Sequence, residues 1–399
     1  MLALRLARTA RPASLRQVTW SHASMPLSRF YSTVDKVNLP KAPSKDELKT
    51  PVPEELIEEV KVLENTPLEP QTSDKATIDL KTQFQAAREA ELAAMTLPER
   101  FVYSLPKSMI PYARLMRMEK PVGTWLLFNP GVWSIGMAAY MSHAAVGPTL
   151  YTLSLFGIGA FIMRSAGCTI NDILDRKLDA QVARTFDRPI AAGDVTVKQA
   201  VAFLGAQCAA GLGILMLLPM NCWWLGALSM PFVMTYPLFK RFTYYPQAVL
   251  SICFTWAALL GPPAMGVWCW PVMLSLWASN FLWCMVYDTI YAHQDKKFDV
   301  EAGIKSTALA WGEHSKSVMT VLTLGQLGLL FGAGVYADMG PGFYSAFTWV
   351  SYRLGRMIKT VDLDDPVNCG KHFRSNINTG HIMSAGILAD WGMRLAGFY

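Results

Sequence analysis

Residues 121–163 read PVGTWLLFNPGVWSIGMAAYMSHAAVGPTLYTLSLFGIGAFIM, and none of these 43 residues is Asp, Glu, Lys or Arg. Residues 199–239 and 242–287 form two further stretches without these four residue types. A helix that crosses the hydrocarbon core of a bilayer needs about 20 mostly apolar residues. Each stretch is therefore long enough for two spans, and the sequence predicts an all-α protein that crosses a membrane several times.

The composition of the whole chain excludes several other classes of protein. Hydrophobic residues make up 52% of the 399 residues and charged residues 17%, whereas about a quarter of a typical soluble domain is charged. The seven cysteines form no CxxC pair and mostly lie inside apolar stretches, which is typical of buried thiols. A soluble globule, a disordered chain and a disulfide-stabilised secreted module are excluded, and no zinc or haem site is encoded at a recognisable spacing.

The long apolar stretches divide into individual spans at short polar or proline-containing segments. The predicted breaks lie at residues 143–147, 219–222 and 266–271. Three more spans are predicted at residues 317–337, 339–352 and 375–398, the last interrupted by Asp390 and Arg394. We therefore expect a polytopic bundle of about nine transmembrane helices.

Basic residues lie on one side of this predicted bundle. Nearly all Lys and Arg after residue 120 fall in predicted loops around residues 164–198, 240–246, 288–316 and 353–374, and the loops near 143, 220, 268 and 338 contain none. Positively charged loops stay on the side from which helices insert. In a mitochondrial inner membrane, the basic side is the matrix side.

The N-terminal quarter of the chain has a different composition. Residues 1–34 have no acid, and their bases are Arg5, Arg8, Arg11, Arg16 and Arg29. This composition is typical of a mitochondrial transit peptide, the alternative being a basic tail. Residues 35–100 are rich in acids and poor in residues that build a core, so we expect a mostly disordered arm. Residues 101–399 are predicted to form the membrane-embedded domain.

Two short windows hold six of the acidic residues. Residues 167–179 read GCTINDILDRKLD and contain Asp172, Asp175 and Asp179. Residues 287–299 read YDTIYAHQDKKFD and contain Asp288, Asp295 and Asp299. In helical conformation, Asn171, Asp175 and Asp179 form one stripe, and Asp288, Asp295 and Asp299 share one face.

The two acidic windows are predicted to end on the same side of the membrane, because four helices separate them. Facing carboxylates repel one another unless cations lie between them, and hard oxygen ligands suit Mg²⁺ bridged to phosphate. A Mg²⁺-diphosphate site is the resulting hypothesis. The alternative is that these are solvated acids at helix ends, paired with Arg176, Lys177, Lys296 and Lys297.

Basic residues on the same side suit the recognition of phosphate or carboxylate groups. They are Arg117, Lys120, Arg184, Arg188, Lys240 and Arg241. The preference of positive charge for this side accounts for any single one of them equally well. His293 lies about 200° around a helix from Asp295, so we expect a helix-surface residue and not a base.

Together these residues resemble a known family, the UbiA-type intramembrane prenyltransferases. The first signature of this family is similar to residues 171–179, with the pattern N-D-x-x-D-x-x-x-D, followed by R-T-x-x-R at residues 184–188. The second signature is similar to residues 288–299. Residues 117–124, 236–241 and 287–295 resemble the branch of the family that prenylates 4-hydroxybenzoate. The resemblance extends over residues 112–399.

The resemblance implies an enzyme that transfers a long polyprenyl group from polyprenyl diphosphate to 4-hydroxybenzoate, ortho to the hydroxyl group, and releases diphosphate. This is an early step of ubiquinone biosynthesis. Implied partners are these two substrates, Mg²⁺, membrane lipid and other enzymes of the pathway, with no nucleic acid. The alternatives are another acceptor, such as homogentisate, dihydroxynaphthoate or haem, and a membrane transporter or scaffold.

The resemblance also assigns roles to individual residues. The catalytic candidates are Asp172, Asp175, Asp179, Asp288, Asp295 and Asp299, of which Asp175, Asp179, Asp295 and Asp299 are the expected metal ligands. The expected substrate-binding residues are Asn171, Arg117, Lys120, Arg188, Lys240, Arg241 and Tyr291. A guanidinium group matches a carboxylate in shape, so we expect Arg241 to hold the carboxylate of 4-hydroxybenzoate.

Overall fold

The structure is a computed structural model of the chain. It describes residues 95–180, 185–296, 299–300 and 303–398. The predicted transit peptide (1–34), residues 35–94 of the acidic arm, and Arg184 lie outside the described residues. The described part contains helices and no strand, which confirms the all-α prediction.

Long helices account for most of the described residues. Two short helices, α5 (Leu97–Ser104) and α6 (Ile110–Leu115), come first. The long helices are α7 (Val122–Ser142), α8 (Val146–Asp179), α9 (Val197–Met216), α10 (Met220–Phe242), α13 (Trp270–His293), α16 (Ser315–Tyr336), α17 (Pro341–Thr360) and α18 (Pro366–Leu395). Between α10 and α13 lie α11 (Pro246–Thr255) and α12 (Ala257–Ala264), and α16 is preceded by α15 (Thr307–Trp311) and the 3₁₀ helix η3 (Gly312–His314).

Several of these helices can cross a membrane. Four helical stretches within the described residues are long and apolar enough: Val146–Asp179, Val197–Met216, Pro246–Ala264 and Thr307–Tyr336. The chain also turns between α7 and α8, between α9 and α10, and between α12 and α13, at or beside the predicted breaks. The membrane-helix architecture is confirmed, and the number nine stays a prediction.

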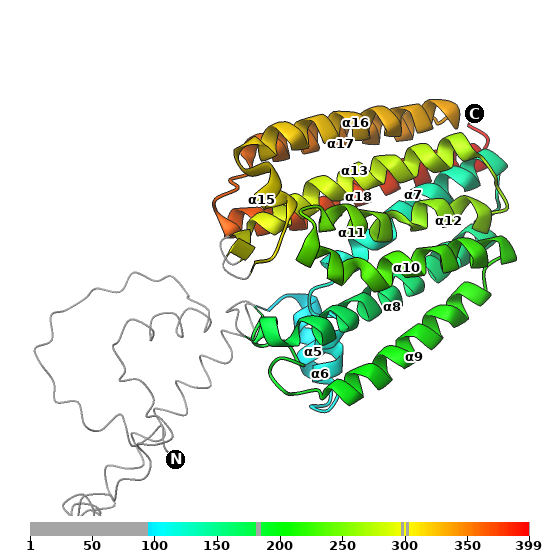
Figure 1. The fold of residues 1–399 in the computed structure, drawn as a ribbon. Coiled ribbons are helices and arrows are strands. Elements are labelled where there is room, and N and C mark those ends of the chain that lie inside the picture. Colours follow the sequence, from blue (N-terminus) through cyan, green and yellow to red (C-terminus); the bar gives the residue numbers. More distant parts are fainter. Residues whose placement is uncertain (1–94, 181–184, 297–298, 301–302, 399) are drawn as a thin grey trace, which may run out of the picture. The chain divides into compact units, whose positions relative to one another are not determined.

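Helices α7 and α13 form the centre of the bundle that residues 96–399 build (Figure 1). α18 packs against α7 and α17, whereas α16 packs against α13. The rings of Trp133 on α7 and Trp283 on α13 stack with centroids 5.2 Å apart, and both side chains are fully buried. α9 lies at one edge of the bundle, beside α8.

Small residues let some helices approach closely. A Cβ atom at Gly261 of α12 would clash with Ser134 Oγ of α7, and one at Gly386 of α18 would clash with Ala346 Cβ of α17. Close backbone approach at small residues is a common way to pack helices in membranes, where lipid removes most of the hydrophobic driving force.

A buried carboxylate joins α18 to the start of α17, at the end of the bundle away from the acidic windows. Asp390, which is 0% exposed, accepts hydrogen bonds from the backbone N–H groups of Gly342 and Phe343 at 2.7 and 2.8 Å. The first N–H groups of a helix have no partner within the helix. The acid that interrupts the predicted last span is therefore an N-terminal cap of the neighbouring helix.

We predict that Asp390→Ala lowers the free energy of unfolding by about 1–3 kcal/mol, because the part-buried N–H of Gly342 and the buried N–H of Phe343 lose their acceptor. Asp390→Asn keeps one acceptor oxygen and should cost less. The melting temperature of the protein in detergent measures both changes. Asp365→Ala is the matched control, because Asp365 accepts from Val367 N–H at 2.8 Å in an exposed cap; an equal loss for Asp365→Ala and Asp390→Ala would contradict the role of burial.

Candidate active site

Three aspartates of α8 lie buried on one face of the helix, close to its C-terminal end. Their exposed fractions are 1% for Asp172, 3% for Asp175 and 7% for Asp179. Spacings of three and four residues put these side chains on one face, because an α-helix has about 3.6 residues per turn. Asn171 lies beside them on α8 and is half-buried. The first predicted cluster therefore lies on one continuous helix.

The helix extends further than the span count implied. Residues 164–179, which the sequence placed in a basic loop, continue α8 without a break. The backbone groups of an α-helix form hydrogen bonds with one another whether the side chains are polar or apolar. A membrane helix can therefore continue as a helix where its sequence becomes charged.

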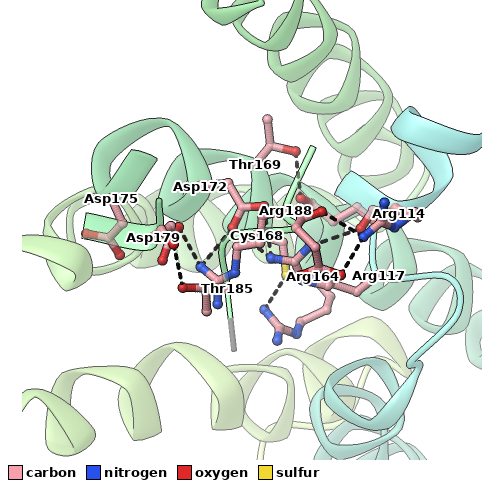
Figure 2. A network of polar contacts seen from close by, with 12 residues as sticks. Arg114, Arg117, Arg164, Cys168, Thr169, Asp172, Asp175, Asp179, Thr185 and Arg188 are labelled. Atoms are coloured by element: carbon pink, nitrogen blue, oxygen red, sulfur yellow. Dashed lines mark hydrogen bonds and ion pairs between the residues drawn. The ribbon is translucent and has the colours of Figure 1, made fainter. Parts of the chain in front are cut away.

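Two arginines from different segments hold the outer two carboxylates (Figure 2). Arg117, in the turn between α6 and α7, donates from Nη2 to both carboxylate oxygens of Asp172, at 2.8 and 2.9 Å. Arg188, beyond the end of α8, donates from Nη1 to Asp172 Oδ1 at 3.2 Å and to Asp179 Oδ2 at 2.8 Å. Charge-assisted hydrogen bonds of this kind are about twice as strong as neutral ones.

The middle carboxylate, that of Asp175, has a different partner. Lys240, in the last turn of α10, contacts Asp175 Oδ2 with its ammonium group. The other oxygen, Asp175 Oδ1, is buried and has no hydrogen-bond partner among the described residues. Since an unpaired buried polar atom is costly, this oxygen is an open acceptor in the middle of the cluster.

The turn that carries Arg117 is held in an unusual conformation. Arg117 has a φ angle of 58°, in the left-handed region that residues other than glycine rarely adopt. Its Nη1 donates to the carbonyl oxygen of Arg114 at 3.1 Å, and Arg114 donates to Asp187 Oδ2 at 2.9 Å. Burial raises the pKa of the neighbouring Glu119 carboxyl. The turn therefore presents the Arg117 guanidinium to the carboxylate of Asp172 on α8.

The second acidic window does not form one continuous helix. α13 ends at His293, and the N–H groups of the next two residues bond to carbonyl groups three residues back, at 3.0 and 3.2 Å. Such bonds tighten the last turn and take the chain out of α-helical register. The single continuous helix on which the predicted shared face of Asp288, Asp295 and Asp299 depended is therefore not found. Asp299 donates its N–H to the carbonyl oxygen of Asp295 at 2.9 Å, so these two remain one turn apart.

The two acidic windows come within electrostatic reach of each other around Tyr236 of α10. This tyrosine interacts electrostatically with Asp175 of the first window and with Asp288 of the second. In the described residues, however, no three His, Cys, Asp or Glu side chains lie close enough to hold a metal ion together. The expected ligands Asp175, Asp179, Asp295 and Asp299 are thus not a preformed cage there.

The remaining predicted substrate-binding residues differ in exposure. Lys120 and Arg241 are exposed, whereas Tyr291 is half-buried and its ring lies 4.8 Å from that of Phe373, between centroids. His293 is 4% exposed, and its Nε2 lies 3.1 Å from Ser315 Oγ at the start of α16. The prediction of a surface histidine is wrong, because the chain turns at His293 and α16 covers the imidazole.

Arg164 is a residue of this region that the sequence reasoning missed. It lies on α8 two turns before the aspartates, donates from Nη1 to Cys168 Sγ at 2.7 Å, and has a buried Nε without a partner in the described part of the chain. It interacts electrostatically with Asp288, Tyr236 and Tyr291. The sequence did contain an indication of this role: Arg164 is the base that ends the 43-residue stretch without charge, and it lies just before the first acidic window.

Comparison with known proteins points to the same family that the sequence motifs resemble. The sequence profile of the UbiA prenyltransferase family matches residues 131–380. The chain is 55% identical over 329 residues to the mitochondrial 4-hydroxybenzoate polyprenyltransferase of Saccharomyces cerevisiae, covering 82% of this chain and 88% of that protein.

Two solved structures share the fold. The apo structure of a UbiA homolog from Aeropyrum pernix K1 matches with a TM-score of 0.58 at 21% identity, over 66% of this chain and 97% of that one. A UbiA homolog from Archaeoglobus fulgidus, bound to GPP and Mg²⁺, matches with a TM-score of 0.52 at 15% identity, over 72% and 99%. From the profile match and the identity to the yeast enzyme, the chain belongs to the UbiA prenyltransferase family.

Proposed function

We propose that this protein transfers a polyprenyl group from polyprenyl diphosphate to the ring carbon of 4-hydroxybenzoate ortho to the hydroxyl group, as an early step of ubiquinone biosynthesis. The observation that carries the proposal is the convergence of three cations on the buried aspartates of α8. The name and the 55% identity of the yeast relative support the choice of acceptor.

The reaction requires that negative charge be accommodated as it develops. The bond between the allylic carbon and the diphosphate oxygen breaks, and the electron pair leaves with the diphosphate. The ring carbon of the phenol attacks the allyl cation, a carbon–carbon bond forms, and loss of the ring proton restores aromaticity. Arg117, Arg188 and Lys240 are placed to stabilise the departing diphosphate, because preorganised cations lower the energy of a charged transition state.

A divalent metal ion fits the donors of this site. Carboxylate oxygens are the ligands that Mg²⁺ prefers, and Asp175 offers a buried oxygen without a partner in the described residues. We propose that Asp175 and Asp179, with Asp295 and Asp299, hold Mg²⁺. When bound, the ion neutralises charge on the diphosphate oxygens. The solved structure of the Archaeoglobus homolog contains Mg²⁺, which supports this choice of metal.

We propose that Arg164 holds the carboxylate of the acceptor. The Arg164 guanidinium has a buried Nε without a partner in the described residues and interacts electrostatically with Asp288 and Tyr291, and a guanidinium can bind a carboxylate through two nitrogens. Arg241, which the sequence suggested for this role, is exposed in the last turn of α10. The exposed position leaves Arg241 suited to attracting anions from the aqueous side.

We further propose that the protein lies in the mitochondrial inner membrane with this site facing the matrix. The supporting features are the basic loops on the site's side and the arginine-rich residues 1–34, proposed here as a transit peptide. The name of the yeast relative includes a mitochondrial location. Residues 35–100 are proposed to be an acidic arm and 101–399 the membrane-embedded domain, with other ubiquinone-pathway enzymes as partners.

The function is tested with the purified protein in liposomes, with Mg²⁺ and a long-chain polyprenyl diphosphate. We expect mass spectrometry to find prenylated 4-hydroxybenzoate when 4-hydroxybenzoate, homogentisate and dihydroxynaphthoate are offered together. EDTA should abolish the product, and added Mg²⁺ should restore it. Prenylation of another acceptor would contradict the assignment of substrate, and the absence of any product would favour a transporter or scaffold.

We predict that Asp175→Asn and Asp295→Asn each lower kcat by more than about 100-fold, because the diphosphate loses its metal-linked stabilisation. The measurement is the initial rate at saturating substrates, with the melting temperature as a check on folding. Asp364→Asn is the matched control, because Asp364 is an exposed acid in the loop before α18. Turnover retained by either of the first two variants would remove that residue from the proposed metal site.

We predict that Arg164→Gln raises the KM for 4-hydroxybenzoate about 10- to 100-fold, the range expected for losing a charged hydrogen-bond donor. The KM for polyprenyl diphosphate should change far less. Arg241→Gln serves as the competing variant, and a larger effect there on the acceptor KM would return the carboxylate-binding role to Arg241. Equal effects of Arg164→Gln on both substrates would also contradict the proposal.

A further inference from the structure

The three α8 aspartates have counter-ions of two kinds. Asp172 receives hydrogen bonds from two guanidinium groups, and Asp179 receives one from Arg188. Asp175 is paired with the single ammonium group of Lys240. A guanidinium group is planar and can share two acceptors, whereas an ammonium group is a point charge on a flexible chain. Asp175 is therefore the carboxylate of this cluster whose partner is most easily displaced.

The backbone around Lys240 is fixed although its side chain is flexible. The carbonyl oxygen of Lys240 accepts the N–H of Lys305 at 2.9 Å. Lys305 Nζ donates to the carbonyl oxygen of Phe242 at 3.2 Å and lies 5.3 Å from the centre of the Tyr244 ring. These contacts hold the end of α10 against the segment before α15. The Lys240 ammonium can thus change partner without movement of its helix.

We propose that Lys240 is an internal counter-ion that stands in for the divalent metal on Asp175 in the free protein and moves to the diphosphate when metal and diphosphate bind. The inference rests on the proposed metal-diphosphate site. Its physical basis is the burial of Asp175, which is 3% exposed: a buried carboxylate without a counter-ion is strongly unfavourable.

The proposal makes the binding of metal and of diphosphate mutually dependent. Metal alone on Asp175 Oδ1 places a second cation on the carboxylate that already pairs with the Lys240 ammonium through Oδ2, and an ammonium repelled from there has no phosphate to bind. Metal together with diphosphate displaces the same ammonium but gives it phosphate oxygens to bind. Each ligand therefore strengthens the binding of the other, and such coupling is reciprocal by thermodynamic linkage.

The test is titration of the purified, substrate-free protein with Mn²⁺, followed by electron paramagnetic resonance of the free ion. Lys240→Gln should tighten Mn²⁺ binding about threefold to tenfold, because the competing cation is gone. Lys240→Arg should weaken Mn²⁺ binding below that of the unaltered protein, because a guanidinium holds the carboxylate more firmly. Arg241→Gln is the matched control, since it removes the same charge one residue away.

A second titration includes inorganic pyrophosphate. In the unaltered protein, pyrophosphate should tighten Mn²⁺ binding, and in Lys240→Gln this enhancement should be smaller. With Asp175→Asn also present, Lys240→Gln should no longer tighten Mn²⁺ binding, because the two residues act through one contact. Melting temperatures establish that the variants are folded, and Lys240→Arg keeps the charge should Lys240→Gln fail to fold.

Three outcomes would overturn the proposal. These are unchanged or weaker Mn²⁺ binding in Lys240→Gln, tightening of the same size in Arg241→Gln, and persistence of the tightening in the Asp175→Asn background. Detectable Mn²⁺ binding by Lys240→Gln alone, where the unaltered protein shows none, would support it. No acceptor or prenyl donor is present in these titrations, so a wrong assignment of the acceptor leaves their outcome unchanged.

Discussion

The pairing of buried aspartates on α8 with cations from three other segments is the interaction on which the rest of the site depends. Asp172, Asp175 and Asp179 are only 1–7% exposed and pair with Arg117, Arg188 and Lys240, and burial of a charge without such a partner is very costly. The same pairs fix the turn before α7, the segment after α8 and the end of α10 relative to one another.

The two ends of the bundle use buried carboxylates for different purposes. Asp390 on α18 accepts two backbone N–H groups at the start of α17, and these bonds join the two helices. The α8 aspartates accept from side chains that carry full positive charge. A backbone cap has nowhere to transfer its hydrogen bonds, whereas a charged side chain can exchange one anion for another. We therefore expect the reaction at the end of the bundle where the α8 aspartates pair with charged side chains.

The sequence predicted the helices and the first acidic window well, because absence of charge and spacing along one helix are local properties. It failed where the answer depends on contacts between segments. The end of α13 at His293 and the burial of that residue beside Ser315 follow from the path of α16. Arg164 was taken as the first base of a loop, and its electrostatic interactions with Asp288 and Tyr236, which come from other segments, place it in the site. The tie between Lys305 and the carbonyl group of Lys240 has no sequence signal at all.

The charge balance of the α8 face gives a reason for a metal ion in addition to the three bases. In the free protein, three aspartates face three cations, so the face as a whole is close to neutral and offers little net attraction to a diphosphate. While these bases remain paired with carboxylates, each of them can contact a phosphate only by exchanging one ion pair for another. A divalent ion on Asp175 would change both conditions together: it adds positive charge at the face and frees Lys240 for the phosphate. Ionisation of the prenyl diphosphate is accelerated when the allyl cation and the departing diphosphate are stabilised more than the intact substrate is.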